Sequence, residues 1–191
     1  MPDSDVERNV AVATIANPAP LGLAAFALTT FVLSAANAKL YDGPQIVIGL
    51  AFFYGGLAQL LAGMWEFKTG NTFGATAFTS YGAFWIAFAT TLQLKLIPPG
   101  DGIGFFLLGW TIFTGILFLA TLKTNAALIA LFALLFVTFL LLTIGAFTAG
   151  STDQLAGYFG LATAFVAWYT AAAGLLAAGK SAFTLPVGPV N

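Results

Sequence analysis

Two segments of the chain have the residue types that begin a helix and leave its first backbone N–H groups free. In the first, Asn17 can cap a helix, and Pro18 suits the first helical position, where its missing N–H costs nothing. In the second, Asn71 follows Gly70 and precedes an apolar run. Free N–H groups at the positive end of a helix dipole bind anions such as carboxylates. The plainer alternative at both segments is an ordinary, well-capped helix start. The candidate binding residues here are Asn17, Pro18, Pro20, Leu21, Gly22, Asn71 and Thr72.

Hydroxyl side chains recur at helical spacing in three apolar stretches. Residues three and four positions apart share one face of a helix, so each set forms a stripe. A stripe of this kind can line a pathway for a small polar solute. The alternative is that each hydroxyl bonds back to its own helix or to a neighbouring one. The three stripes are Thr72, Thr76 and Thr79; Phe26, Thr30, Ser34 and Asn37; and Phe159, Thr163, Ala167, Thr170 and Gly174.

Two further polar residues belong to one apolar stretch. Gln59 is the only amide within it, and an unpaired buried amide costs a few kcal/mol, so Gln59 is expected to face another helix or a ligand. Glu66 follows Trp65 at the end of the stretch and is expected to be a solvated anchor at the membrane boundary. If protons are coupled to the movement of an acid, they travel on the acid itself or through Glu66.

The residue inventory excludes most catalytic chemistry. The chain has no histidine and no cysteine, which removes the commonest general base, the usual metal ligands and the thiol nucleophile. No pair of carboxylates lies within an apolar run. A net charge of −1 gives no electrostatic case for nucleic acid. We therefore expect no enzyme activity, no metal and no cofactor.

The elements that position these residues are membrane-spanning helices. Apolar residues make up 60% of the 191 positions and charged residues only 7%, so a soluble surface could not be covered. Six uncharged runs are each close to the ~20 residues that cross the hydrocarbon core. They are Leu21–Ala38, Ile46–Trp65, Phe73–Leu94, Ile103–Leu122, Ala126–Phe147 and Leu155–Ala178. The sequence predicts an all-α membrane protein, a bundle of six transmembrane helices.

Short polar connections between the runs predict one domain, residues 17–180, flanked by a polar tail over 1–16 and a short tail over 181–191. The first run is expected to be a span and not a signal peptide, because its leading segment is net acidic. Six spans leave both termini on one side. With that side cytoplasmic, the inner segments hold four basic residues and the outer ones two, which favours cytoplasmic termini. The inner residues are Arg8, Lys68, Lys123 and Lys180, and the outer ones are Lys39 and Lys95.

Three segments of the chain resemble the acetate uptake transporters, also called the succinate–acetate permease family. The first is NPAPLGL over 17–23. The second begins with FYGGLAQ over 53–59 and ends with GNTFGATAFTSYGAFW over 70–85. The third runs from AGY at 156–158 to AWY at 167–169, with Leu185-Pro186 after it. The resemblance extends over essentially the whole chain.

The resemblance implies a six-helix protein of the cell membrane that assembles as a homo-hexamer, with one pore in each protomer. It implies transport of acetate, and of succinate and related short acids in some members, as a channel or with protons. It also implies a hydrophobic constriction at Phe26, Tyr81 and Leu135, with carboxylate contacts near the opening motif and Gln59. Two other functions stay open: a channel for a neutral solute such as urea or ammonia, and a membrane sensor that does not transport.

Overall fold

Every regular element in the described part of the chain is helical. The structure is a computed structural model that describes residues 15–43, 45–96, 101–179 and 181–190. Most of the predicted N-terminal tail, with Arg8, and also Lys180 lie outside the described residues. The elements are α1 (Ala19–Asn37), α2 (Ile46–Phe52), the π-helix η1 (Phe53–Ala58), α3 (Gln59–Thr69), α4 (Thr72–Gln93), α5 (Gly102–Thr121), α6 (Ala126–Phe147) and α7 (Asp153–Ala178).

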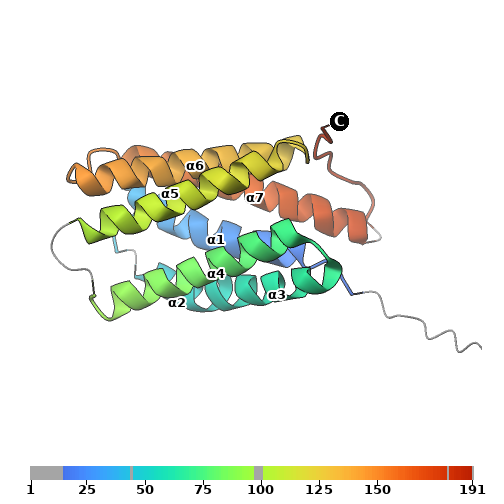
Figure 1. Ribbon diagram of the computed structural model, residues 1–191, viewed down its shortest axis with the longest axis horizontal. Coiled ribbons are helices and arrows are strands. Elements are labelled where there is room, and N and C mark those ends of the chain that lie inside the picture. The colour runs from blue at the N-terminus through green and yellow to red at the C-terminus, as the bar shows by residue number, and fades with distance from the viewer. Residues whose placement is uncertain (1–14, 44, 97–100, 180, 191) are drawn as a thin grey trace, which may run out of the picture.

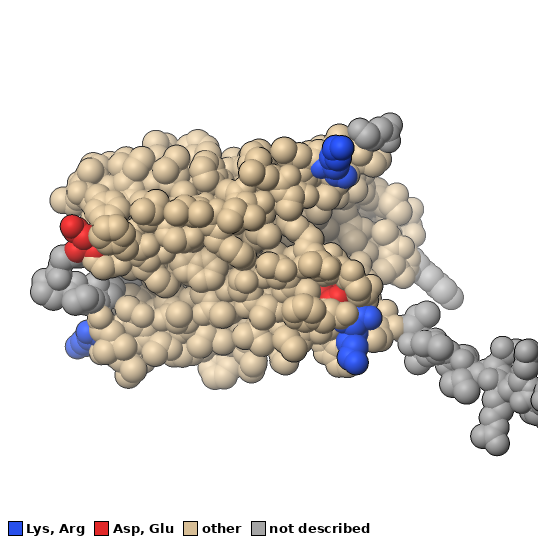
Figure 2. Space-filling model, viewed as in Figure 1, with Lys and Arg blue, Asp and Glu red and all other residues tan. Residues whose placement is uncertain are grey.

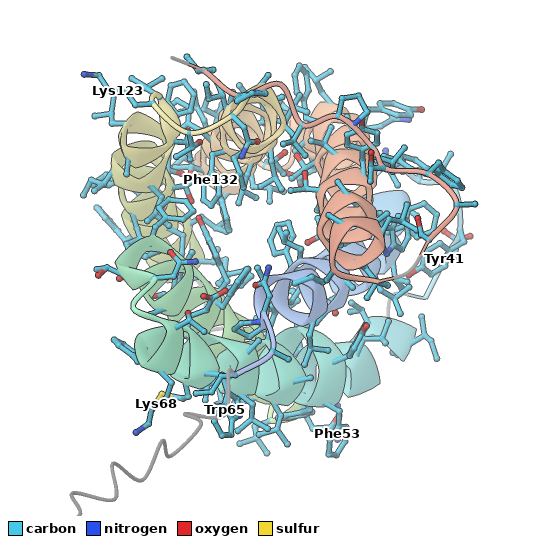
Figure 3. The ribbon with its side chains drawn as sticks, turned by 90° about the vertical axis from the view of Figure 1, so that its right-hand side faces the viewer. Tyr41, Phe53, Trp65, Lys68, Lys123 and Phe132 are labelled. Atoms are coloured by element: carbon cyan, nitrogen blue, oxygen red, sulfur yellow. The ribbon has the colours of Figure 1, made fainter. Side chains whose placement is uncertain are left out.

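The long helices lie nearly parallel to one another and form a ring when viewed along the bundle (Figures 1 and 3). The most extensive packing joins α1 to α7, α5 to α6, α6 to α7, and α3 to α4. By contrast, α4 and α5 touch at few points. Short connections make α3 and α4, α5 and α6, and α6 and α7 antiparallel neighbours, whereas α1 and α7 pack together although they are the first and last helices of the chain. The arrangement brings the starts of α1, α4 and α6 to the same end of the ring.

Five helical segments are long and apolar enough to cross a membrane. They are Ala19–Asn37, Ile46–Thr69, Gly102–Thr121, Ala126–Phe147 and Asp153–Ala178, which confirms five of the six predicted runs. The remaining run, predicted at Phe73–Leu94, is the 22-residue helix α4. This helix does not reach the same apolarity, because threonine, serine, tyrosine and glycine interrupt its apolar residues. The chain is a multi-pass membrane protein.

The second predicted run is longer and less regular than expected. It continues from Ile46 through η1 to Thr69, four residues beyond the predicted end at Trp65. The π-helical segment contains Gly55 and Gly56, and a Cβ on Gly55 would collide with the side chain of Thr29 on α1. Helix α1 therefore approaches η1 closely at the π-helical turn. A π-helical turn is a local widening of a helix and is found frequently at functional sites.

The extension of α3 also corrects the expectation for Glu66. This residue is only 1% exposed, so it is not a solvated anchor at the membrane boundary. It lies on the face of α3 that packs against α4, where a Cβ on Gly74 would come within 2.8 Å of its carboxyl carbon. The glycine leaves room for the carboxyl group between the two helices.

Charged and apolar side chains divide the surface as a bilayer requires. On the face drawn in Figure 2, the blue and red side chains lie at the two ends of the bundle, and the flank between them is uncharged. Large apolar residues such as Phe53 and Trp65 point outward from the ring (Figure 3). Lys68 and Lys123 lie at the same end of the molecule, as the predicted topology requires (Figure 3).

The segment after α7 folds back over the start of α6. The backbone N–H groups of Ala126 and Ala127 donate to the carbonyl oxygens of Gly188 (2.7 Å) and Val187 (3.1 Å). The hydroxyl of Tyr169 on α7 donates to the carbonyl of Pro186 at 2.5 Å. We call residues 186–190 the C-terminal strap, because the segment is tied to both helices.

Candidate functional site

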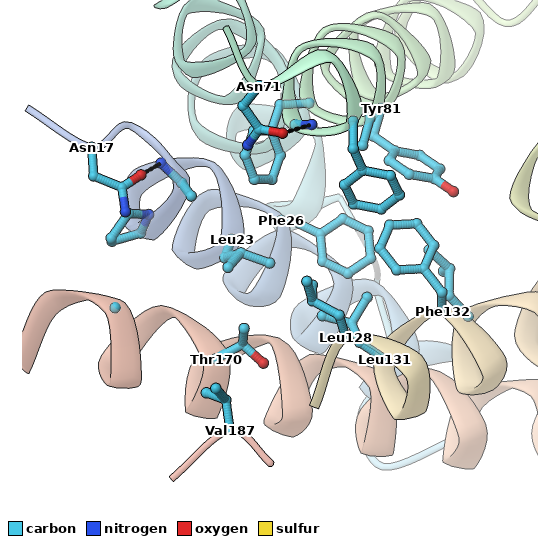
Figure 4. A pocket seen from close by; sticks show the side chains of 18 residues that line it. Asn17, Leu23, Phe26, Asn71, Tyr81, Leu128, Leu131, Phe132, Thr170 and Val187 are labelled. Carbon is cyan, nitrogen blue, oxygen red and sulfur yellow. Dashed lines mark hydrogen bonds between the residues drawn. The ribbon is translucent and has the colours of Figure 1, made fainter. Parts of the chain in front are cut away.

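A cavity of about 210 Å³ occupies the end of the ring where α1, α4 and α6 begin (Figure 4). Its walls are almost entirely apolar and come from α1, α4, α6 and α7, with Val187 of the C-terminal strap at one side. We call it the first cavity. The lining residues are Asn17, Ala19, Pro20, Leu23, Phe26, Asn71, Phe73, Gly74, Ala77, Phe78, Tyr81, Leu128, Leu131, Phe132, Leu135, Thr170, Gly174 and Val187.

The two predicted helix starts both reach this cavity. The side chain of Asn71 caps α4, since its Oδ1 accepts the N–H of Gly74 at 3.0 Å. Asn17 Oδ1 accepts the N–H of Ala19 at 3.0 Å, and α1 begins at Ala19, one residue later than the sequence predicts for an Asn17 cap. Both asparagines line the first cavity, one at the start of α1 and the other at the start of α4 (Figure 4).

The three helix starts differ in how many N–H groups they leave free. At α6, the strap and the side chain of Asn125 together accept the N–H groups of residues 126–128. At α4, the N–H groups of Thr72 and Phe73 have no partner within the described residues. At α1, Pro20 has no N–H to offer. The start of α4 is therefore the strongest donor to an anion in the first cavity.

A second, smaller cavity of about 40 Å³ lies deeper, between α1, α4 and α6. Its lining includes every member of the stripe predicted on the first run. Two buried polar atoms on its walls, Thr30 Oγ1 and Trp85 Nε1, have no hydrogen-bond partner in the described part of the chain. Unpaired buried donors are costly, so a polar guest or water is favoured here. The lining is Phe26, Thr30, Leu33, Ser34, Asn37, Tyr81, Phe84, Trp85, Leu135, Thr138, Phe139 and Leu142.

Phe26, Tyr81 and Leu135 line both cavities and lie between them. The rings of Phe26 and Tyr81 are 5.8 Å apart, centre to centre. The hydroxyl of Tyr81 shares a hydrogen bond of 2.9 Å with that of Thr114 on α5, which fixes the ring. All three side chains are at most 5% exposed. We call these three residues the neck. They are the same residues that the family resemblance indicated for a constriction.

Several residues predicted at the site lie away from both cavities. Leu21 is 47% exposed on the outer surface, and Thr72 and Thr76 are also exposed. Thr79 contacts Gly63 of α3. Gln59 is only 1% exposed, and its Oε1 has no hydrogen-bond partner among the described residues. The opening motif also supplies packing, because a Cβ on Gly22 would come within 2.8 Å of the ring of Phe78.

The side of α4 that faces the first cavity is therefore offset by one or two residues from the side that carries the threonine stripe. Phe73, Ala77 and Tyr81, at helical spacing, line the first cavity in place of Thr72, Thr76 and Thr79. Phe132 of α6, whose ring lies 5.2 Å from that of Phe73, also lines the first cavity but was not among the predicted residues. The first three turns of α6, before Thr138, are entirely apolar, so their sequence does not distinguish a cavity-facing residue from a lipid-facing one.

The arrangement suits the passage of a small, weakly held solute. Among the described residues, no Asp, Glu, Lys or Arg lines either cavity. An anion in the first cavity meets only partial charges, from helix starts and amides, and then an apolar neck. Binding that is favourable but not tight allows a solute both to enter and to leave. No group of three or more metal-ligating side chains is found in the described ranges.

The family model described as the GPR1/FUN34/yaaH family matches residues 4–191. The chain is 49% identical to acetate permease A of Emericella nidulans, over 94% of this chain and 68% of that protein. It is 47% identical to ammonia transport outward protein 2 of Saccharomyces cerevisiae, over 84% of this chain and 61% of that protein. The chain thus spans about two-thirds of the length of these fungal relatives.

Bacterial relatives are matched over almost their whole length. The succinate-acetate/proton symporter SatP of Escherichia coli is 38% identical, over 91% of this chain and 96% of that protein. The solved structure of the bacterial acetate channel SatP superposes with a TM-score of 0.86 at 39% identity. The match covers 92% of this chain and 100% of that one. The helices and the cavities between them therefore belong to a fold that includes an acetate channel.

Proposed function

The chain belongs to the GPR1/FUN34/yaaH family, and on that basis we propose that it transports acetate and related short monocarboxylates across a membrane. The observation that carries the proposal is a pair of cavities that share Phe26, Tyr81 and Leu135 as lining, inside a bundle that superposes on an acetate channel. Acetate, with one methyl group and one carboxylate, fits a first cavity of about 210 Å³ with room for water.

The proposed working form has six spans, with α4 as the sixth. Its 22 residues match the length of its neighbours, and its hydroxyl groups can be satisfied on its own backbone, as Thr90 is on the carbonyl of Ile86. Six spans leave both termini on one side, and we propose that this is the cytoplasmic side of the cell membrane, because the segments on that side hold more basic residues. We also propose a homo-hexamer with one pore per protomer, as the resemblance to the family implies.

The carboxylate is first held at the starts of α4 and α1. The free N–H group of Phe73, with the amides of Asn71 and Asn17, offers partial positive charge without a formal charge. This interaction is weak enough to be reversible. Among the opening-motif residues, Pro18, Pro20 and Gly22 set the position of α1, and Leu21 faces outward.

The solute then crosses the neck and enters the second cavity. Passage between Phe26, Tyr81 and Leu135 removes most of its water, so bulky or strongly hydrated solutes are excluded. On the far side, Thr30 Oγ1 and Trp85 Nε1 can replace part of that lost hydration, because they have no other partner among the described residues. A small carboxylate therefore exchanges water for protein donors on both sides of the barrier.

The names of two relatives bear on the substrate range. The Escherichia coli relative is named for succinate as well as acetate, and for protons. The Saccharomyces cerevisiae relative is named for ammonia transport, which favours a small neutral solute as the second candidate. A neutral solute would pass the apolar neck without the desolvation cost of a carboxylate, so the two candidates differ in how acetate affects flux.

Uptake of labelled acetate by the purified protein in liposomes tests the proposal. We expect uptake above that of empty vesicles, with competition by propionate. A proton gradient that increases uptake, beyond the leak of acetic acid through lipid, indicates coupled transport and not a channel. Ammonia or urea flux that acetate does not inhibit would indicate that the protein is a channel for a neutral solute. Acetate binding without any flux would assign the sensor.

A further inference from the structure

Glu66 is a buried carboxyl group, and one of its two oxygens has no hydrogen-bond partner among the described residues. It is 1% exposed, on α3. Its Oε2 accepts a hydrogen bond of 3.0 Å from the hydroxyl of Thr69. Its Oε1 is fully buried and has no hydrogen-bond partner among the described residues. A carboxylate left in this state costs several kcal/mol of solvation, unless it is protonated or faces positive potential.

The unpaired oxygen lies at the start of α4. The position that a Cβ of Gly74 would take is 3.0 Å from Glu66 Oε1 and 2.5 Å from Asn71 Nδ2. Both Asn71 and Gly74 line the first cavity. The backbone N–H of Asn71 also donates to the carbonyl oxygen of Glu66 at 3.1 Å, which holds the two residues together. Glu66 therefore lies directly behind the wall that receives the substrate.

We propose that the carboxylate of Glu66 and the carboxylate of the substrate compete for the positive end of α4, so that substrate binding takes up one proton on Glu66. One helix start carries about half a unit of positive charge, which cannot balance two carboxylates in a site of low dielectric. When two carboxylates share such a site, the protonated form of one of them is favoured. The proposal rests on the proposed transport of carboxylates and names the residue that couples it to protons.

No other ionisable group on the packed elements can take this role. The helices around Glu66 are α1, η1 and α4, and α1 has no ionisable side chain. The remaining candidates are Lys68, which is exposed, Tyr54 on η1, and Tyr81, whose hydroxyl is bonded to Thr114. The proton acceptor closest to the cavity wall is therefore the free oxygen of Glu66.

The sign of the pH dependence follows from this competition. Bound acetate favours the protonated form of Glu66, because the start of α4 cannot balance two carboxylates. Where Glu66 is ionised in the free protein, each bound acetate must bring a proton with it. Over that pH range, acetate affinity falls by up to about tenfold per pH unit.

Titration calorimetry of acetate binding in two buffers of different ionisation enthalpy measures the protons taken up. The purified full-length protein is compared with Glu66→Gln, which keeps the shape of the side chain and cannot ionise. For the wild type we expect uptake approaching one proton per acetate and an affinity that falls as pH rises. For Glu66→Gln we expect no proton uptake and a pH-independent affinity that is at least as high. Asp42→Asn, a change of an exposed carboxyl after α1, serves as the matched control and should behave as wild type.

The outcomes separate this inference from the proposed function. Absence of acetate binding in folded wild-type protein counts against carboxylate transport itself. Binding without proton uptake in the wild type, or proton uptake that persists in Glu66→Gln, leaves carboxylate transport standing and refutes the role of Glu66. Persistent uptake would mean that the protein binds acetic acid.

A measurement on wild-type protein keeps the proposal testable if Glu66→Gln does not fold. Infrared difference spectra are recorded as acetate is added, with unlabelled and with ¹³C-labelled acetate. Protonation of Glu66 adds a carboxylic-acid C=O band that does not move with the label. A spectrum in which every new carboxylic-acid band moves with the label would overturn the proposal.

Discussion

Removal of the Phe26 ring is the sharpest test of the neck between the cavities. The ring lines both cavities and lies 5.8 Å from that of Tyr81, so Phe26→Ala joins spaces of about 210 and 40 Å³. A carboxylate in the intact neck gives up water hydrogen bonds, at a cost of a few kcal/mol. A wider neck lets water accompany the ion. We expect the barrier to fall by about 1.4 kcal/mol, which corresponds to a roughly tenfold higher acetate flux.

Size selection should weaken in the same variant. Succinate is longer than acetate and carries a second carboxylate, so it gains more from the added width, and we expect the ratio of succinate to acetate flux to rise. Labelled uptake by liposomes with a known amount of protein per vesicle measures both rates. Phe165→Ala is the matched control, since this phenylalanine of α7 is 58% exposed on the outer surface and lines neither cavity.

The variant must be shown to fold before its flux is interpreted. A fully packed phenylalanine costs about 3–5 kcal/mol of stability when changed to alanine. The loss of stability in Phe26→Ala should be smaller than this, because part of the ring of Phe26 faces cavities. Phe26→Leu is a milder replacement. Folded Phe26→Ala protein with wild-type acetate flux and an unchanged succinate ratio would refute the assignment of the barrier to the neck.

Three further changes test the framework around the site. Thr114→Val removes the hydrogen-bond partner of Tyr81 and should lower the stability by about 1–3 kcal/mol; an unchanged melting temperature in detergent would contradict this. Gly63→Ala drives a methyl group into α4 and should cost about 1–3 kcal/mol, whereas Gly49→Ala, which meets nothing within 4 Å, should be neutral in the same assay. Gly188→Ala is strained at φ +65° and should loosen the C-terminal strap; faster hydrogen exchange at residues 126 and 127 is the expected result, and unchanged exchange would argue against it.

The proposed role of Glu66 offers a physical reason why related proteins are named both as a symporter and as a channel. One relative is named a proton symporter and a solved structure is named a channel. A proton taken up with each bound carboxylate is compatible with a static pathway, because the coupling resides in electrostatic competition at the start of α4. Large movements of the helices are not required for binding and protonation to be linked.

The sequence by itself determined the helical bundle and the helix starts. Long uncharged runs have no stable alternative to helices in hydrocarbon, since every backbone group must be bonded within its own segment. Capping is also local: Asn71 caps α4 as predicted, and Asn17 bonds within its own turn of chain. Five of the six apolar runs were therefore confirmed, with boundaries wrong by a few residues.

Only the tertiary structure decided which side of each helix faces the cavities and which polar groups are buried. A membrane helix can be apolar all round, so periodicity does not show whether lipid or protein covers a given side, and the threonines of α4 face away from the first cavity. Glu66 was expected in water because it follows the last apolar residue of its run, yet α4 covers it where Gly74 leaves space. The C-terminal strap likewise depends on contacts between residues about 60 positions apart. Such long-range packing leaves no local pattern in the sequence.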